Sequence, residues 1–388
     1  MRTYARILSA GAIAGIVLGT AGTASAEDAA LPKLMTWTAY TVGTSGYGQA
    51  VAIGNMLKTK LGVTVRVLPG RNDVSRLKPL VAKRAQLCSC GASLYIAQEG
   101  LRLFTGKTWG PQPARMVMMS LSPIGMMMAT QKDRGIKTLA DLKGKRVGYI
   151  SGGPTQNIIT EANLAFAGLT WKDVKRVEFS SYVASIKGLI NGQVDSIIAV
   201  TVSPAMRQVA AAPDGLVWLT TPHDDAAGWK RYLTVAPYFL KMKVRVGAAV
   251  PKGKTMDGAM YPYPILISIG GLSDANAYAL AKAMVENYDA YKDNAPGAKG
   301  WSIRAQKFRW VIPYSNGAIR YFKEIGKWTD ADQAHNDGLV KRQAVLAAAW
   351  KEVTAKQGGL DDAEFSKAWL AARSAALKAA GMPDHVQH

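Results

Sequence analysis

Residues suited to binding an anion crowd into a short stretch near the start of the chain. Residues 41–48 read TVGTSGYG, with glycines at 43, 46 and 48 among hydroxyl side chains and a tyrosine, and a helix-like run follows. The first N–H groups of a helix lack intrahelical acceptors, and the helix dipole favours negative charge there. The loop therefore predicts an anion site. Its occupant could be a nucleotide, a substrate undergoing chemistry or a solute that is carried.

Motifs for nucleotide binding and covalent catalysis do not fit this loop. The glycines lack the GxGxxG spacing, no GK[ST] completes a phosphate-binding loop, and Tyr47 stands where a GxSxG elbow needs its second glycine. Ser75 to Lys78 matches the SxxK pattern of penicillin-binding enzymes, but the companion SDN and KTG motifs are missing. We interpret that stretch as a turn of a surface helix.

Side chains that act as acids, bases or metal ligands are scarce. His223 stands beside two aspartates without a further ligand-rich motif, and a loop with acidic turn residues explains the stretch. Cys88 and Cys90 form a CxC pair, which alone is not a zinc site. We interpret the cysteines as small apolar residues of a buried strand, with a local disulfide as the alternative. No catalytic residue, metal or cofactor is predicted.

The N-terminal residues predict export. Arg2 and Arg6 precede the apolar residues 7–18, and Ala24-Ser25-Ala26 is a small-residue cleavage signature. Cleavage after Ala26 would remove two arginines and no acids, which lowers the formal charge from +21 to +19. The basic residues are scattered, so we expect most of them to form a solvated surface, with attraction of an anionic ligand as the alternative, and no nucleic-acid partner. No later segment reaches the about 18 apolar residues of a membrane span, so the mature protein should not be membrane-embedded.

Strand-like and helix-like segments alternate along the rest of the chain, which predicts parallel sheets covered by helices. Strands are expected at 35–41, 63–68, around 87, 146–150, 176–181 and 194–200. The mature chain exceeds the size at which one hydrophobic core stops growing, so we expect two α/β lobes. Ligands of open α/β sheets bind at the carboxyl ends of the strands. The glycine loops 41–48 and 151–157 and the segment 201–204 should therefore converge on one cleft.

These segments resemble the TAXI family of solute receptors, which serve TRAP transporters. The resemblance rests on TVGTSGYGQAVAIGNMLK (41–58), IKTLADLKGKRVGYI (136–150), SSYVASIKGLINGQVDSIIAVTVSPA (180–205) and IPYSNGAIRYFKEIGKW (312–328). It spans most of residues 36–328 in the right order. The chain departs from the family at SGGPTQN (151–157), where GxPGSGT is usual, and at Tyr314-Ser315-Asn316, which replaces a usual histidine-proline.

The resemblance implies a two-lobed, periplasmic-binding-protein-like α/β fold with a ligand cleft between the lobes. It implies a periplasmic receptor that closes on a small organic anion, such as a dicarboxylate, a 2-oxo acid or a glutamate-like amino acid. The anion would pass unchanged to an ion-gradient-driven permease. We expect a monomer without cofactors. Alternatives are a ligand-binding sensor or interaction protein, and an exported hydrolase on the same scaffold.

The expected division of the chain is a signal peptide (1–26), a first lobe (27–123), a second lobe (124–264), a return to the first lobe (265–329) and a helical C-terminal extension (330–388). Ten side chains are predicted to bind the solute: Thr44, Ser45, Tyr47, Ser93, Thr155, Gln156, Asn157, Thr201, Ser203 and Tyr261. The first two would hold a carboxylate, and Tyr47 would cover apolar carbons. Helix capping is the alternative role for Ser93 and several others.

Overall fold

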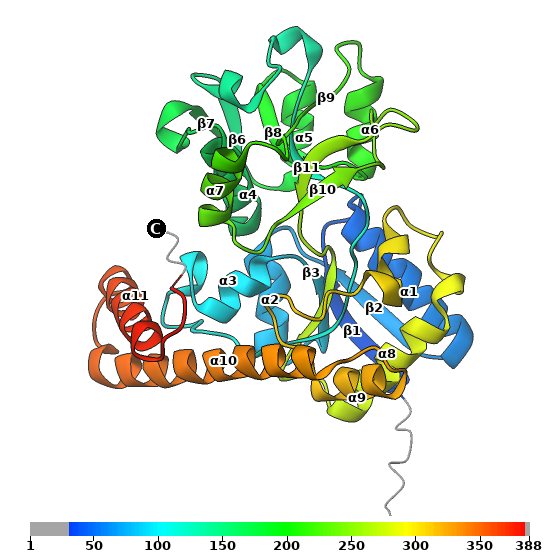
Figure 1. Ribbon diagram of the computed structural model, residues 1–388, viewed down its shortest axis with the longest axis vertical. Helices are drawn as coiled ribbons and strands as arrows, with labels where there is room; N and C mark the ends of the chain where they lie inside the picture. The colour runs from blue at the N-terminus through cyan, green and yellow to red at the C-terminus, as the bar shows by residue number, and fades with distance from the viewer. Residues whose placement is uncertain (1–30, 385–388) are drawn as a thin grey trace, which may run out of the picture.

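Two α/β lobes and a helical extension make up the computed structural model, which describes residues 31–384 (Figure 1). The expected signal peptide and its cleavage site lie outside the described residues. Within residues 31–384, no helix has the length and apolar character needed to cross a membrane.

Lobe 1 contains a five-stranded sheet in the order β2-β1-β3-β12-β4. Its strands are β1 (Leu34–Ala39), β2 (Thr64–Pro69), β3 (Leu87–Cys90), β4 (Ala114–Met119) and β12 (Ile265–Ile269). Its helices are α1 (Ser45–Leu61), α2 (Asp73–Val81), α3 (Ser93–Glu99), α8 (Asp274–Glu286) and α9 (Asn316–Glu324). The predicted alternation in β2 is confirmed, because Val65 and Val67 are half-buried while Thr64 and Arg66 are exposed.

Lobe 2 contains a second five-stranded sheet in the order β7-β6-β8-β5-β9 and a separate pair, β10-β11. The strands are β5 (Met126–Thr130), β6 (Arg146–Ile150), β7 (Lys175–Phe179), β8 (Ser196–Val200), β9 (Val217–Leu219), β10 (Leu240–Val244) and β11 (Met256–Met260). The helices are α4 (Pro154–Phe166), α5 (Tyr182–Ile190), α6 (Pro204–Ala211) and α7 (Ala226–Val235). The methionines of β5 are buried in the core.

The sheets are mixed, whereas the sequence pattern predicted parallel ones. In lobe 1, β12 runs antiparallel to both β3 and β4. In lobe 2, β5 runs antiparallel to both β8 and β9. The reason is topological. Each of these strands arrives directly from the other lobe, and therefore enters its sheet from the edge at which the neighbouring strands end.

The chain crosses between the lobes twice, and the two crossings are hydrogen-bonded to each other. One crossing joins β4 to β5 and the other joins β11 to β12. The N–H of Ser120 donates to the carbonyl of Pro264 at 2.8 Å, and the N–H of Tyr263 donates to the carbonyl of Ser120 at 2.6 Å. Because backbone bonds hold the crossings side by side, the lobes share one short connection around which they can move.

Cys88 and Cys90 form a disulfide within β3. This corrects the interpretation of the two residues as free, small apolar side chains. Their side chains lie on one face of the strand because strand residues two apart share a face, and both are fully buried. The shared face was therefore predicted correctly, and the disulfide is the alternative that the sequence had left open.

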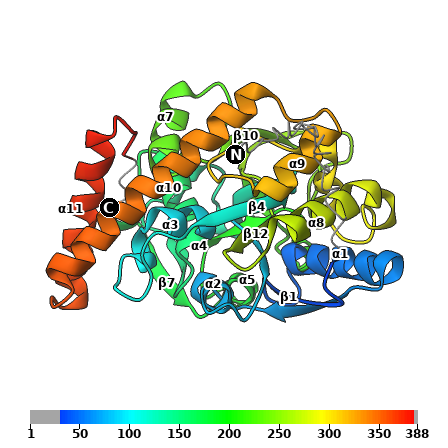
Figure 2. The ribbon, with the colours of Figure 1, turned by 90° about the horizontal axis from the view of Figure 1, so that it is seen from below.

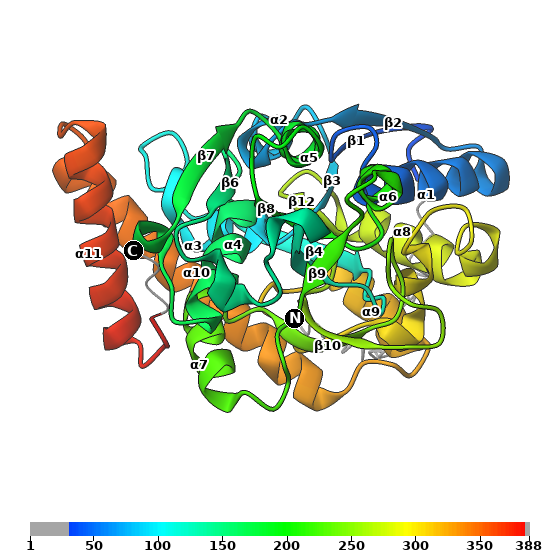
Figure 3. The same cartoon turned by 90° about the horizontal axis from the view of Figure 1, so that it is seen from above.

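The C-terminal extension consists of α10 (Asp330–Gln357) and α11 (Asp362–Ala379). Helix α10 runs along lobe 1, on the side away from lobe 2 (Figure 1). In the views from below and above, α11 stands at one edge of the molecule (Figure 2, Figure 3). The two helices share a small apolar core of their own, formed by Leu346, Ala349, Val353, Phe365, Trp369 and Leu377.

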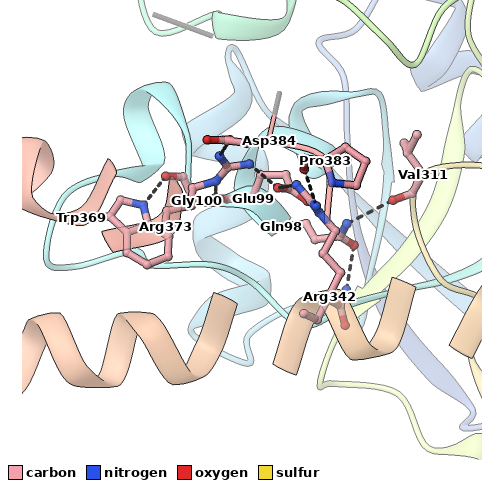
Figure 4. Close-up of polar contacts among 10 residues, drawn as sticks. Gln98, Glu99, Gly100, Val311, Arg342, Trp369, Arg373, Pro383 and Asp384 are labelled. Atoms are coloured by element: carbon pink, nitrogen blue, oxygen red, sulfur yellow. Dashed lines mark hydrogen bonds and ion pairs between the residues drawn. The ribbon is translucent and has the colours of Figure 1, made fainter. Parts of the chain in front are cut away.

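A buried carboxylate joins the extension to lobe 1 (Figure 4). Glu99, at the end of α3, is fully buried and accepts two hydrogen bonds of 2.7 Å from the guanidinium of Arg342. It also pairs with Arg373, which is itself fully buried and donates to the Glu99 carbonyl at 3.0 Å. Trp369 donates its indole N–H to the Gly100 carbonyl at 2.6 Å. The extension is therefore an integral part of lobe 1.

Replacing Glu99 by glutamine should lower the free energy of unfolding by about 3–5 kcal/mol, because Arg342 would lose its acidic partner and Arg373 would keep only Asp384. Urea unfolding followed by circular dichroism measures the loss. Glu352→Gln is the matched control, since Glu352 pairs with Lys356 on an exposed face and its removal should change nothing measurable. Equal midpoints for the two variants would contradict this account.

Candidate ligand-binding cavity between the lobes

A small cavity lies where the two lobes meet. The centre of a water-sized sphere can occupy about 40 Å³ of it. Its lining comes from both lobes and from the second crossing: Tyr40, Thr44, Ser45, Met126, Thr155, Gln156, Ile159, Tyr182, Ile198, Ala199, Val200, Ser203, Tyr261 and Tyr263. Most of these residues are less than 9% exposed. The lobes are therefore closed over the cavity, and its size limits any occupant to a small solute.

Six of the ten residues predicted from the sequence line this cavity, and they come from both lobes. They are Thr44, Ser45, Thr155, Gln156, Ser203 and Tyr261. The predicted convergence of the two glycine loops and the segment after β8 is therefore present in the structure. Tyr47, Ser93, Asn157 and Thr201 are not part of the lining.

Lobe 1 contributes the start of α1. Thr44 is the N-cap, whose hydroxyl accepts from the N–H of Tyr47 at 3.3 Å and donates to the Thr41 carbonyl at 2.7 Å. The preceding Gly43 has φ +87°, a conformation that glycine adopts without strain. The N–H groups of Ser45 and Gly46 belong to the first turn and have no intrahelical acceptor. This turn can therefore hold an acceptor group of a solute.

Lobe 2 contributes hydrogen-bonding atoms that lack partners. Thr155 is 2% exposed, and neither its hydroxyl nor the Oε1 of Gln156 has a hydrogen-bond partner within the described residues. Ser203, also 2% exposed, lies beside the hydroxyl of Tyr182. A buried polar atom without a partner costs roughly 1–3 kcal/mol. A solute that bonds to these atoms would recover that free energy.

Two of the predicted residues that do not line the cavity hold the backbone of lobe 2 in place. The Asn157 side chain accepts from the N–H of Ile150 at 2.8 Å and donates to its carbonyl at 2.9 Å. The Thr201 hydroxyl accepts from the N–H of Gly125 at 3.1 Å and donates to the Val246 carbonyl at 2.8 Å. Both groups are therefore satisfied without a solute.

The other two residues outside the lining, Tyr47 and Ser93, belong to lobe 1. Tyr47 is half-buried in the first turn of α1. Ser93 is fully buried, and its hydroxyl has no hydrogen-bond partner within the described residues. Helix capping does not explain Ser93, because the N-cap of α3 is Ala92. No contact in the structure accounts for its hydroxyl.

Tyrosines form much of the cavity wall, and three of them were not predicted. Tyr40, Tyr182 and Tyr263 join Tyr261, which alone was named. Two glycines give them room: a Cβ at Gly46 would lie 2.7 Å from the Tyr263 hydroxyl, and one at Gly91 would lie 2.3 Å from the Tyr40 hydroxyl. Glycines in the sequence are therefore a signal of where the aromatic side chains approach the backbone.

Burial raises the pKa of Tyr40, Tyr182, Tyr261 and Tyr263 above that of an exposed tyrosine. The four hydroxyls therefore stay protonated and neutral throughout the physiological range. None of the fourteen lining residues is Asp, Glu, Lys, Arg or His. The cavity consequently offers hydrogen bonds from uncharged groups.

An ion pair lies behind this uncharged lining. Asp73 and Arg76 of α2 are both about 1% exposed or less and form a salt bridge. The guanidinium lies 4.0 Å from the ring centre of Tyr40, a lining residue. The prediction that the stretch from Ser75 to Lys78 is an ordinary surface helix turn was therefore wrong for Arg76. It was correct for Ser75, whose hydroxyl forms a capping box with Asn72.

Nothing in the described range gathers three or more metal-ligating side chains of the His, Cys, Asp and Glu types. His223 bonds to the carbonyl of Gly258 at 3.0 Å, and Asp225 caps α7 by accepting from Gly228 at 2.7 Å. The stretch from His223 to Asp225 is therefore a structural loop, as its composition predicted.

The two lobes, the paired crossings and the closed cavity define a periplasmic-binding-protein-like fold, as expected. Residues 38–326 match the model of the NMT1-like family, and the chain belongs to that family. No curated protein sequence matches it.

Three solved structures to which this chain is similar are solute-binding proteins. One is an ancestral arginine-binding protein bound to arginine, 16% identical, covering 70% of this chain and 99% of that one, with a TM-score of 0.43. Another is the alkanesulfonate-binding protein SsuA from Xanthomonas axonopodis pv. citri bound to MOPS. It is 15% identical, and the match covers 92% of this chain and 97% of that one, with a TM-score of 0.45. A third is the periplasmic aliphatic sulphonate binding protein SsuA from Escherichia coli. It is 14% identical, and the match covers 92% of this chain and 90% of that one, with a TM-score of 0.44. Identities this low say nothing about the ligand of this chain.

Replacing Thr201 by alanine should destabilise the fold and not only weaken binding. The change leaves the Gly125 N–H and the Val246 carbonyl unpaired, which predicts a loss of roughly 1–3 kcal/mol in the free energy of unfolding. Thr201→Ser keeps the hydroxyl and is the control. Urea unfolding of the solute-free protein measures both variants, and a wild-type midpoint for T201A would assign the hydroxyl a different role.

The raised tyrosine pKa values also predict how stability depends on pH. An unfolded chain loses tyrosine protons near pH 10, whereas the folded cavity keeps them. Stability should therefore be unaffected by these groups up to about pH 9 and should fall above about pH 10. Urea unfolding at several alkaline pH values measures the fall. Tyr263→Phe should make it shallower, and an unchanged slope in that variant would refute the assignment.

Proposed function

We propose that this protein is a periplasmic receptor that captures a small organic acid between its lobes and delivers it, unchanged, to a membrane permease. The observation that carries the proposal is the cavity itself, which is lined from both lobes, has no charged side chain in its lining, and carries hydroxyl and amide oxygens without partners on its lobe 2 side. A site of this kind is suited to binding a solute. Its lining has serine and threonine hydroxyls but no His, Asp, Glu or Lys side chain to activate one of them as a nucleophile.

The proposed solute class follows from the hydrogen-bonding groups. The first turn of α1 offers N–H groups and the hydroxyl of Ser45 on one side of the cavity. Helix N-termini of this kind bind carboxylates, and the tyrosines and the apolar side chains of β8 would cover a short carbon chain. Dicarboxylates, 2-oxo acids and glutamate-like amino acids are the candidates.

The proposed partner is the permease of a TRAP transporter of the TAXI type, which uses an ion gradient. The support is the resemblance of four segments of the sequence to TAXI receptors, together with membership of the NMT1-like family. Export follows from the basic and apolar N-terminal residues and the small-residue signature at Ala24 to Ala26.

A thermal-shift screen of the refolded mature protein tests the proposal. The panel contains dicarboxylates, 2-oxo acids, and acidic and neutral amino acids. A solute at 100 times its dissociation constant adds about 2.7 kcal/mol to stability, which shifts the melting temperature by several degrees. One clear hit that the protein does not turn over supports a receptor. Turnover of the hit would instead establish an enzyme.

Thr155→Val then tests the site. Valine keeps the shape of threonine and removes only the unpartnered hydroxyl, so affinity for the hit should fall by roughly 1–3 kcal/mol. Thr38→Val is the matched control, because the Thr38 hydroxyl is equally buried and unpartnered within the described residues but lies outside the lining. Calorimetric titration measures both. Equal affinities would remove Thr155 from the site.

A further inference from the structure

The start of α4 receives its hydrogen-bond acceptor from the opposite lobe. The N-cap of α4 is Gly153, which has no side chain to accept a bond, and Pro154 at the first position has no N–H. The N–H of Thr155 is therefore the first that needs an acceptor. It donates to the carboxylate of Asp73 in lobe 1, at 2.9 Å.

Further contacts hold this carboxylate in place across the junction of the lobes. The N–H of Asp73 donates to the carbonyl of Gly152 at 3.3 Å. The Asn72 side chain fills the space beside Gly152, where a Cβ would come within 2.7 Å of its Nδ2. Asp73 is fully buried and paired with Arg76. The start of α2 is thus fitted to the loop that opens α4.

The charges of this arrangement cancel. The N-terminus of a helix favours a negative group, and Asp73 supplies one, while Arg76 balances the charge of Asp73. The cavity on the other side of Thr155 contains no charged side chain. A carboxylate of a solute brought to the start of α4 would find the first free N–H of the helix already bonded to Asp73, whose carboxylate would repel it.

We propose that Asp73 determines the charge selectivity of the receptor. Its carboxylate occupies the anion position of lobe 2, so the site selects a solute whose only carboxylate is bound at the start of α1. The end that meets α4 is then uncharged, as in an amide or a simple monocarboxylic acid. This inference rests on the proposed function and narrows its solute class by excluding dicarboxylates.

Isosteric pairs of solutes measure the selectivity directly. Glutamine and glutamate differ in charge but hardly in shape, as do succinamate and succinate. In calorimetric titrations, the wild-type protein should bind the amide of at least one pair about tenfold or more tightly than the acid. In Asp73→Asn this ratio should fall at least tenfold. Asp195→Asn is the control, because Asp195 pairs with Arg146 inside lobe 2 and its loss lowers the total negative charge equally.

The single variant leaves Arg76 buried without its counter-charge and could fail to fold. The double variant Asp73→Asn/Arg76→Gln removes both charges, and it should also bind the acid about as well as the amide. Wild-type protein that binds an acid at least as tightly as its amide would overturn the inference and leave the receptor function standing. An unchanged ratio in both Asp73 variants would overturn it too. Binding of no pair and no panel member would refute the receptor function, and the inference with it.

Discussion

The contact between the two lobes depends on how the backbone N–H groups at the starts of two helices find their acceptors. Helix α1 in lobe 1 is capped locally by Thr44. Helix α4 in lobe 2 has glycine at its N-cap and proline next to it, so its first free N–H depends on Asp73 from the other lobe. Closing therefore satisfies a donor that the open protein leaves to water. A second contact between the lobes, from Arg102 to Glu161 at 3.2 Å, lies nearer the surface and contributes less for that reason.

The cavity wall also consists largely of buried, uncharged polar groups. Four tyrosines line a space without charged side chains, and three of them, Tyr40, Tyr261 and Tyr263, are buried. Gly46 and Gly91 allow two of these rings to approach the backbone directly. The rings also pack against one another, with Tyr40 and Tyr263 at 5.2 Å and Tyr261 and Tyr263 at 6.2 Å between ring centres. The unpartnered atoms of Thr155 and Gln156 in the same wall remain for a solute.

Local patterns predicted the elements of this fold well, because strand alternation and helix-start signals are short-range. Residues 146–150 were expected as a strand and form β6. Six of the residues that the sequence singled out as solute-binding line the cavity, since residues at the carboxyl ends of neighbouring strands meet at one edge of a sheet. It failed where a contact joins distant segments. Nothing near Asp73 indicates that its carboxylate bonds to Thr155, and nothing near Thr201 indicates that Gly125 and Val246 use its hydroxyl.

The attachment of the C-terminal extension is another contact between distant segments that local sequence patterns do not predict. Among the described residues, its hydrogen bonds and ion pairs to the body of the protein reach lobe 1, including Glu99, Gly100, Thr105 and Trp310. The extension is therefore attached to lobe 1. Glu99 ends α3, and the turn that opens α3 follows Gly91, which contacts Tyr40 and Tyr261. Two buried arginines therefore fix the far end of this short helix, whose near end lies next to tyrosines of the cavity wall.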